Sequence, residues 1–254
     1  MADKPNSAIV IPARRHSTRL PEKMLLSETG RPLVVHTVEA AAQNTKTSSI
    51  IVATDDQAIL EAVESHGHQV EMTSADHLSG TDRVAEVAQR HPEFDIIVNL
   101  QGDEPAISGQ AIDLAIEMLE LNPQAMLSTL ATPIRSRELL EDPSCVKVVL
   151  DADGKALYFS RSPIPHVRGG HQDELLSAEP AHFLQHIGLY AYRRELLMEF
   201  SQLPTCPLEK LESLEQLRVL SAGYSILVGL VDEPLRGIDT PEDYELFVRK
   251  WASG

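Results

Sequence analysis

The sequence predicts an α/β fold built on a mostly parallel, doubly wound sheet. Short apolar runs rich in β-branched residues are typical of buried strands, and they alternate from the start with segments whose apolar residues recur at helical spacing. The first strands are expected at 8–11, 49–54 and 69–73, with helices between them at 32–42 and 57–66. Sheets of this kind carry their sites at the C-terminal ends of the parallel strands.

The second half of the chain predicts an antiparallel addition to this sheet. Asp151-Ala-Asp-Gly154 is a hairpin signal, so the strands on either side of it leave the parallel register. A polar segment rich in glycine and glutamate, 167–181, predicts a mobile loop. The other expected elements are a helix at 107–121 and strands at 95–105, 125–132, 145–150, 156–160, 185–193 and 224–231.

One long helix is expected at 208–220, where leucines recur every third residue from Leu208 to Leu217. Glu212, Glu215 and Gln216 would then share a different face, because helical residues three and four positions apart are neighbours. A solvated helix face is the usual explanation for such a group.

Composition limits the class of protein. The chain has 254 residues and a formal net charge of −16, which argues against general nucleic-acid binding but allows a local basic pocket for a nucleotide. No apolar run approaches the roughly 20 residues of a membrane span, and the polar N-terminus lacks a signal core. A cytoplasmic location is therefore expected.

The two cysteines fit reduced structural thiols, because Cys145 and Cys206 are far apart in sequence.

A cationic loop follows the first strand. It carries Arg14, Arg15, Arg19 and Lys23, with only Glu22 against them, in a chain that is otherwise strongly acidic. A cationic loop at the C-terminal end of an early strand is a natural place to hold phosphates. A solvated surface loop with scattered arginines explains the same residues equally well.

Two later segments carry candidate binding groups. Ser79-Gly80-Thr81 is an expected helix N-cap, and the same geometry would offer backbone N–H groups to a base or phosphate. Asp103, beside a glycine at the end of an apolar strand, is a candidate oxygen ligand for Mg²⁺, although turn carboxylates are common. Near the C-terminus Thr240 is expected to cap the last helix, which leaves Asp239 without a capping role.

Taken together, the ordered motifs resemble a known family. They are Ile11-Pro-Ala-Arg14, Ser17-Thr-Arg-Leu-Pro21 with Lys23, Val52-Ala-Thr-Asp55, Ser79-Gly-Thr81, Val98-Asn-Leu-Gln-Gly-Asp-Glu-Pro105, Tyr158-Phe-Ser-Arg161, His186-Ile-Gly-Leu-Tyr190, Leu214-Glu-Gln-Leu-Arg218 and Asp239-Thr-Pro-Glu-Asp243. Each of these motifs alone is weak evidence for a family. As an ordered set along nearly the whole chain they resemble the CMP-Kdo synthetases, the 3-deoxy-manno-octulosonate (Kdo) cytidylyltransferases of lipopolysaccharide synthesis.

The resemblance implies a Rossmann-like nucleotidyltransferase fold. It implies one domain over 1–254, with an inserted antiparallel, β-rich segment at about 130–200 that binds the sugar and forms a homodimer. It implies CTP and Kdo as substrates, Mg²⁺ as cofactor, and CMP-Kdo and pyrophosphate as products.

The resemblance also implies roles for individual residues. Arg14 and Lys23 would bind the triphosphate, and Asp103 and Asp239 would hold the magnesium ion next to the nucleotide; these four would be the catalytic residues. The cytosine and ribose would be surrounded by Ala13, Ser79, Gly80 and Thr81. The Kdo pocket would be lined by Gln101, Arg161, His186, Tyr190, Glu215 and Gln216.

This chain departs from the family pattern at three positions. Glu22 and Met24 stand where the family usually has glycine and proline, and Arg15 stands where it usually has an aromatic residue. Glu22 places a negative charge beside Lys23 in sequence, which bears on closure of the loop and on CTP affinity.

The implied chemistry is attack of the sugar's anomeric hydroxyl on the α-phosphorus of CTP, which needs positioning and charge neutralisation more than covalent chemistry. No strong general base is evident, so deprotonation is assigned to the metal. The alternatives are a cytidylyltransferase for sialic acid or the 8-amino analogue of Kdo, and a non-catalytic nucleotide-binding protein that kept the fold.

Overall fold

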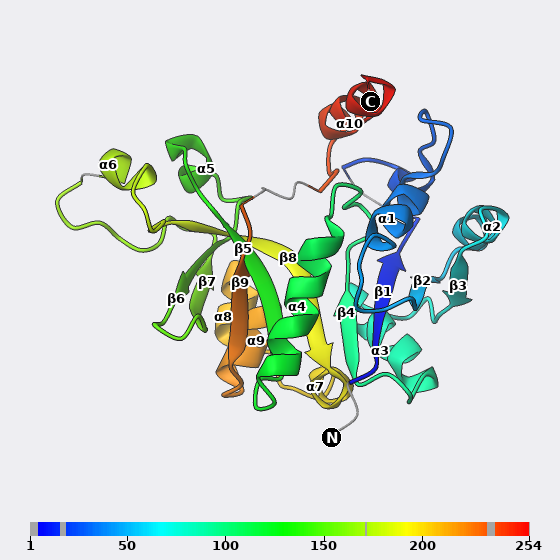
Figure 1. Cartoon of the computed structure of the whole chain (residues 1–254), viewed down its shortest axis with the longest axis horizontal. Helices are drawn as coiled ribbons and strands as arrows, with labels where there is room; N and C mark the ends of the chain where they lie inside the picture. Colours follow the sequence, from blue (N-terminus) through cyan, green and yellow to red (C-terminus); the bar gives the residue numbers. More distant parts are fainter. Residues whose placement is uncertain (1–4, 16–18, 171, 233–236, 254) are drawn as a thin grey trace.

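The computed structural model describes residues 5–15, 19–170, 172–232 and 237–253. Ser17 and Thr18 of the family motif lie outside these residues. The central sheet runs in the order β3-β2-β1-β4-β8-β5-β9, with a β6–β7 hairpin attached beside β8 (Figure 1).

The first half of the chain forms the parallel part of the sheet. Strands β1 (Ser7–Ala13), β2 (Ile50–Thr54), β3 (Gln69–Met72) and β4 (Ile96–Asn99) pair in parallel register. The connecting helices are α1 (Leu33–Ala41), α2 (Gln57–Ser65) and α3 (Gly80–Arg90), and α4 (Gly109–Leu121) follows β4. The predicted alternation of strands and helices is confirmed.

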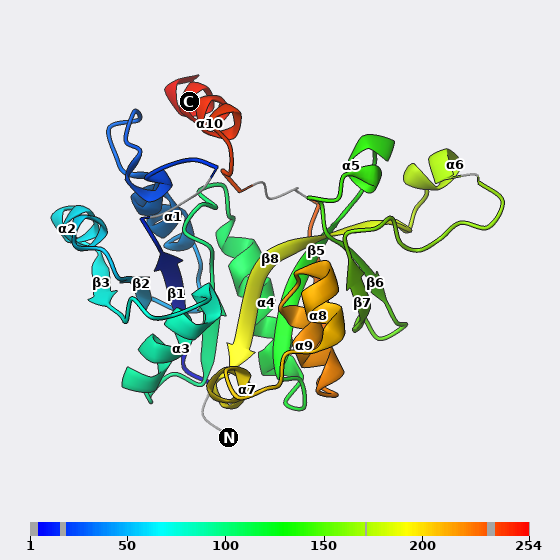
Figure 2. The same ribbon diagram turned by 180° about the vertical axis from the view of Figure 1, so that it is seen from behind.

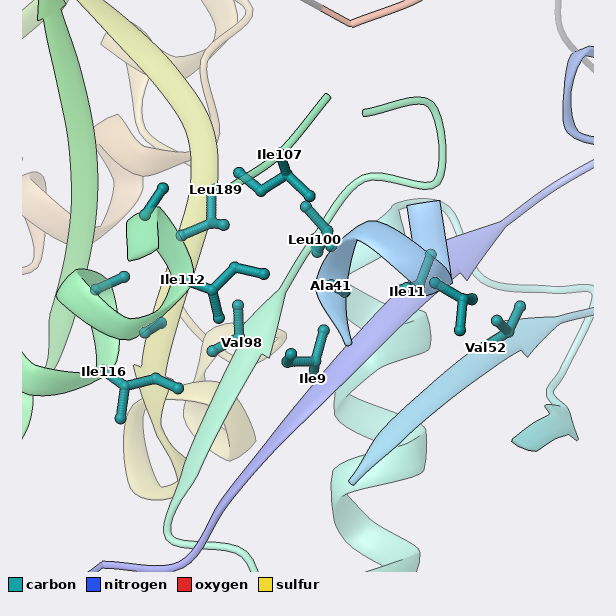
Figure 3. Packing of buried hydrophobic residues seen from close by; sticks show 14 of the residues in the cluster. Ile9, Ile11, Ala41, Val52, Val98, Leu100, Ile107, Ile112, Ile116 and Leu189 are labelled. Atoms are coloured by element: carbon teal, nitrogen blue, oxygen red, sulfur yellow. The ribbon is translucent and has the colours of Figure 1, made fainter. Parts of the chain in front are cut away.

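Two apolar layers cover the sheet because successive strand residues point to opposite faces. On one face Ile9 and Val98 pack against Ile112 and Ile116 of α4 (Figure 3). On the other face, seen in Figure 2, residues such as Val10 pack under α3 and α7 (Arg194–Phe200).

The second half of the chain adds the antiparallel part. β8 (Leu184–Arg193) lies between β4 and β5 (Leu127–Pro133) and is antiparallel to both, whereas β5 pairs in parallel with β9 (Ile226–Leu230). β6 (Lys147–Leu150) and β7 (Ala156–Ser160) form the predicted hairpin, which α5 (Arg137–Glu141) precedes. The mostly parallel sheet with an antiparallel segment is confirmed, and the last strand of that segment, β8, lies inside the main sheet.

The single helix predicted at 208–220 is wrong. The chain forms α8 (Pro207–Glu212) and α9 (Gln216–Ser221), separated at Ser213, which has a left-handed backbone with φ 53°. Leu214 and Leu217 are buried but Leu211 is 83% exposed, so the leucine repeat does not form one apolar face. Glu212 and Glu215 consequently do not share a helix face.

The mobile loop predicted at 167–181 is also wrong in part, because it contains the short helix α6 (Gln172–Leu176). Leu176 is buried in a small apolar cluster with Ile134, Leu140 and Phe183. Val167 and Leu175 of the same segment also pack against this cluster, so apolar contacts hold a segment whose polar composition predicts a loop.

The last helix, α10 (Pro241–Ser253), stands above the C-terminal end of the parallel strands (Figures 1 and 2). Thr240 caps it as predicted: its Oγ1 accepts a hydrogen bond from Asp243 N at 3.2 Å, and Asp243 Oδ2 accepts one from Thr240 N at 3.1 Å. None of the helices in the described part of the chain is long and apolar enough to cross a membrane.

Candidate active site

Lys23 and two aspartates meet at the C-terminal edge of the parallel strands. Lys23 begins the short 3-10 turn η1 (Lys23–Leu25), and its side chain is only 8% exposed. Its Nζ makes a short hydrogen bond to Asp103 Oδ2 and lies 3.1 Å from Asp239 Oδ1. Two carboxylates that are distant in sequence therefore converge on one ammonium group.

Close backbone packing fixes Asp103 in this position. Gly102 precedes it, and a Cβ atom there would lie 3.0 Å from Met24 Sδ and 3.3 Å from the carbonyl oxygen of Pro12. The carbonyl oxygen of Asp103 accepts a hydrogen bond of 2.9 Å from Ile238 N, which brings the segment containing Asp239 alongside. Only glycine at position 102 allows this approach without a shift of its neighbours.

Asp239 is held by a small satellite core between α10 and the cationic loop. Leu20, Leu33, Ile238 and Tyr244 are buried together there. Tyr244 also bonds to Glu28 beyond η1, through its hydroxyl. Burial and this hydrogen bond raise the Tyr244 pKa to about 12. The position of Asp239 therefore depends on packing against the loop that carries Lys23.

Arg14 joins the cationic loop to the start of α3. Its guanidinium donates hydrogen bonds to the carbonyl oxygens of His77 at 2.8 Å and Leu78 at 3.4 Å. Ala13, before it, is fully buried at the end of β1. Ser79 caps α3, because its Oγ accepts from Asp82 N at 3.1 Å and Asp82 Oδ2 accepts from Ser79 N. The capping role of Ser79 is thus present in the structure, with Gly80 and Thr81 in the first helical turn.

Two of the departures from the family pattern, Arg15 and Glu22, contact each other. Arg15 donates to Glu22 Oε1 from Nε at 2.9 Å and from Nη2 at 2.6 Å. Glu22 has a left-handed backbone with φ 53°, a conformation that favours glycine. The Glu22 carboxylate therefore pairs with Arg15, while Lys23 binds the two aspartates.

A cavity of about 280 Å³ lies between β4, β8, α3 and the break that precedes α9, and its wall includes Gln101, two residues before Asp103. Residues predicted for the nucleotide and for the sugar share its wall. The predicted residues that line it are Gly80, Thr81, Gln101, Tyr190, Glu215 and Gln216.

The cavity presents both buried and exposed polar groups. Gln216 is 5% exposed, and its Nε2 is buried without a hydrogen-bond partner among the described residues. Glu215 Oε2 accepts from Thr81 Oγ1 at 3.0 Å, and burial raises the Glu215 pKa above its ordinary value. A buried amide donor without a partner is costly, so Gln216 marks a place where a polar ligand would be favoured.

Two residues predicted for the sugar pocket lie outside this cavity's wall. His186 is buried and bonds Thr129 Oγ1 through Nε2 at 2.9 Å; burial lowers its pKa to about 3, so the imidazole is neutral. Its ring lies 5.4 Å from that of Tyr190. Arg161 donates to the carbonyl oxygens of Glu212 at 2.7 Å and Pro143 at 3.0 Å.

Sequence reasoning missed six residues of this region: Asn99, Gly188, Tyr192, Ser213 and Leu214 in the cavity wall, and Glu104 near the aspartates. Asn99 and Tyr192 line the cavity, and Tyr192 could have been found because it follows Tyr190 by two positions on one strand face. Glu104 lies beside the aspartates: its Oε2 is buried and has no partner within the described residues. Burial, with Asp103 and Asp239 nearby, raises the Glu104 pKa to about 8. The signal for Glu104 was its place after Asp103 in the same motif.

The carboxylate pair is chemically suited to a hard divalent cation. Asp103 and Asp239 already direct oxygens at one cationic atom, and carboxylate oxygens are preferred ligands of Mg²⁺, which keeps several waters when bound. In the described ranges no three or more His, Cys, Asp or Glu side chains gather as a metal site. A metal at the pair would therefore rely on water and substrate oxygens for the rest of its shell.

The fold and these polar groups define a nucleotide-binding α/β protein, with its site at the carboxyl ends of the strands. Residues 8–226 match the family model described as cytidylyltransferase, and the chain belongs to this family. The Kdo cytidylyltransferase of Rhodopirellula baltica is 48% identical over 96% of this chain and 98% of its own. The enzyme of the same name from Geobacter sulfurreducens is 46% identical over 96% of this chain and 99% of its own.

Solved structures agree with this assignment. A structure of CMP:2-keto-3-deoxy-manno-octonic acid synthetase complexed with CTP has a TM-score of 0.89 and 42% identity, covering 98% of this chain and 99% of that one. A cytidylyltransferase from Leptospira borgpetersenii has a TM-score of 0.63 at 18% identity, covering 98% of this chain and 88% of that one. This second likeness concerns the fold alone.

Proposed function

We propose that this chain is a 3-deoxy-manno-octulosonate cytidylyltransferase, which transfers the cytidylyl group of CTP to Kdo and releases pyrophosphate. The observation that carries the proposal is the convergence of Lys23, Asp103 and Asp239, together with a polar cavity whose wall includes Gln101, two residues before Asp103. Relatives of this name cover nearly the whole chain at 45–48% identity. The product would supply the activated sugar for lipopolysaccharide synthesis.

The cationic loop is assigned to the triphosphate. Lys23, Arg14 and Arg19 lie on this loop, and cationic side chains there would neutralise the charge that develops on the leaving pyrophosphate. Lys23 and Arg19 both contact Asp239 in the conformation described, so they are already oriented to the same place. Ala13 and the Ser79-Gly80-Thr81 turn are assigned to the cytosine and ribose.

The cavity is assigned to the sugar acid. Gln101, Glu215 and Gln216 offer amide and carboxylate groups suited to the hydroxyls of Kdo, and Tyr190 forms part of the wall. The resemblance also assigns Arg161 and His186 to the sugar, and we assign them to the Kdo carboxylate, although both lie outside the wall of this cavity. Because the His186 imidazole is neutral, it would contribute a hydrogen bond there instead of a positive charge.

Asp103 and Asp239 are assigned to Mg²⁺. When bound, the metal would supply Lewis-acid polarisation of a phosphoryl oxygen and lower the pKa of a bound hydroxyl. The chain itself provides the two carboxylates, the cationic loop and the polar cavity wall that would orient the substrates.

The test is pyrophosphate release from CTP and Mg²⁺ with Kdo, 8-amino Kdo and sialic acid in parallel. Kdo should support the highest kcat/KM. A clear preference for either other sugar would change the assigned substrate, and absence of turnover with all three would refute the proposed activity.

A cytoplasmic homodimer is also part of the proposal. Leu157 of β7 and Leu208 and Leu211 of α8 are exposed, and apolar surface of this kind is suited to a subunit interface. Glu212 at the end of α8 bonds Ser160 at the end of β7, so these two elements are adjacent. Sedimentation of the wild type and of Leu211→Glu tests this: a monomeric wild type would contradict it.

A further inference from the structure

Lys23 binds the same carboxylates that are assigned to the metal. Nζ contacts Asp103 Oδ2 directly and lies 3.1 Å from Asp239 Oδ1. The Lys23 side chain is 8% exposed, whereas that of Asp239 is 44% exposed. The ammonium group is therefore desolvated between its two partners and has lost much of the water that would otherwise stabilise it.

A divalent cation and this ammonium group compete for those oxygens. Mg²⁺ binds carboxylate oxygens at about 2.0–2.1 Å, and an ammonium group bonds to them at about 2.7–2.9 Å. If both bound the same oxygens, the metal and Nζ would lie within about 5 Å of each other, where like charges in a poorly solvated site repel strongly. Lys23 must therefore leave at least one aspartate before a metal ion binds both.

The local charges favour joint entry of metal and nucleotide. Asp103 and Asp239 are balanced by Lys23 and Arg19, which contacts Asp239 Oδ2 at 3.1 Å. A divalent cation alone would leave an excess of positive charge in this cluster. A triphosphate removes that excess and offers Lys23 new anionic partners in place of the aspartates.

We propose that Lys23 is an internal counter-ion that excludes a divalent cation from Asp103 and Asp239 until a nucleoside triphosphate draws its ammonium group away. This inference rests on the proposed function, because it concerns the same metal site. It gives Lys23 a second role besides phosphate binding: metal affinity becomes dependent on nucleotide.

The test is binding of Mn²⁺, followed by electron paramagnetic resonance, to the full chain without and with CTP. The variants are Lys23→Met, which removes the charge, and Lys23→Arg, which keeps it. Without CTP, Lys23→Met should bind Mn²⁺ about tenfold more tightly than the wild type, because one nearby positive charge is lost. Lys23→Arg should stay as weak as the wild type, and CTP should raise wild-type affinity far more than that of Lys23→Met.

Adding Asp103→Asn to Lys23→Met locates the ion, because the gained site should then disappear. Thermal unfolding of each variant in chelator verifies the fold, and Lys23→Gln replaces Lys23→Met if the latter does not fold. If Lys23→Met and the wild type bind Mn²⁺ equally without CTP, while CTP creates a site that needs Asp103, the exclusion by Lys23 is refuted and the proposed function stands. If no condition gives a site that depends on Asp103, the metal assignment fails and this inference with it.

Discussion

Replacing Asp103 with asparagine should abolish most turnover while the chain still folds. The substitution keeps the size of the side chain and removes the charge that meets Lys23 Nζ. Loss of one electrostatic group aimed at the reacting phosphates lowers kcat by about 10²–10³-fold in comparable sites. We expect a loss at the upper end of this range, because Asp103 is one of only two carboxylates assigned to the metal.

The cost in stability should be much smaller. Asp103 is partly exposed, and in the variant Lys23 keeps its contact of 3.1 Å with Asp239. Weakening one charge-assisted hydrogen bond costs about 1–3 kcal/mol of the free energy of unfolding. In a chain of this size that lowers Tm by roughly 2–4 °C for each kcal/mol, so the variant remains folded at assay temperature.

The assay is pyrophosphate release from CTP and Kdo over a range of Mg²⁺ concentrations, with calorimetric unfolding alongside. Asp113→Asn is the matched control: its carboxylate bonds the backbone of Thr45 and Lys46, away from the cluster, so turnover should be unchanged. Near-normal turnover of Asp103→Asn at saturating Mg²⁺ would refute the metal assignment.

Three further predictions concern single residues. Gln216→Leu should raise KM for the sugar about tenfold with no loss of Tm, since its buried Nε2 has no partner in the part of the chain described; an unchanged KM would contradict the cavity assignment. The His186 pKa is about 3 in the folded chain and 6.5 in the unfolded chain, so the unfolded state takes up the proton first as the pH falls. The free energy of unfolding should therefore fall by about 2 kcal/mol from pH 7 to pH 5. Denaturant unfolding should show a smaller decrease over this pH range for His186→Gln. Glu22→Gly should be at least as stable as wild type in thermal unfolding, whereas Glu22→Val should lose about 1–2 kcal/mol at a left-handed position; equal Tm values for the two would contradict this.

The strands were predictable because local sequence determines them. The run 96–98 is apolar on both faces, which is typical of a strand covered on both sides, and β4 is buried throughout. The hairpin at 151–154 was equally local, because its turn residues specify the connection between β6 and β7.

The break between α8 and α9 was not predictable from the leucine spacing. The structure buries Leu214 and Leu217 but not Leu211, and Ser213 adopts φ 53° to allow it. Serine rarely marks such a turn in sequence, and the benefit comes from tertiary contacts: Glu212 bonds Ser160 and Arg161 N, while Glu215 reaches Thr81. The hydrophobic periodicity of one segment carries no information about hydrogen-bond partners that lie in other elements.

The position of Lys23 shows the same limit at the site itself. Topology places the ends of β1 and β4 at one edge, so a meeting of the cationic loop with Asp103 could be expected from sequence. Lys23 is separated from Asp103 by 80 residues in sequence and from Asp239 by 216. The contact with Asp239 depends on how α10 packs against Leu20 and Leu33. A change in that apolar packing would move a metal-assigned carboxylate without altering any charged residue.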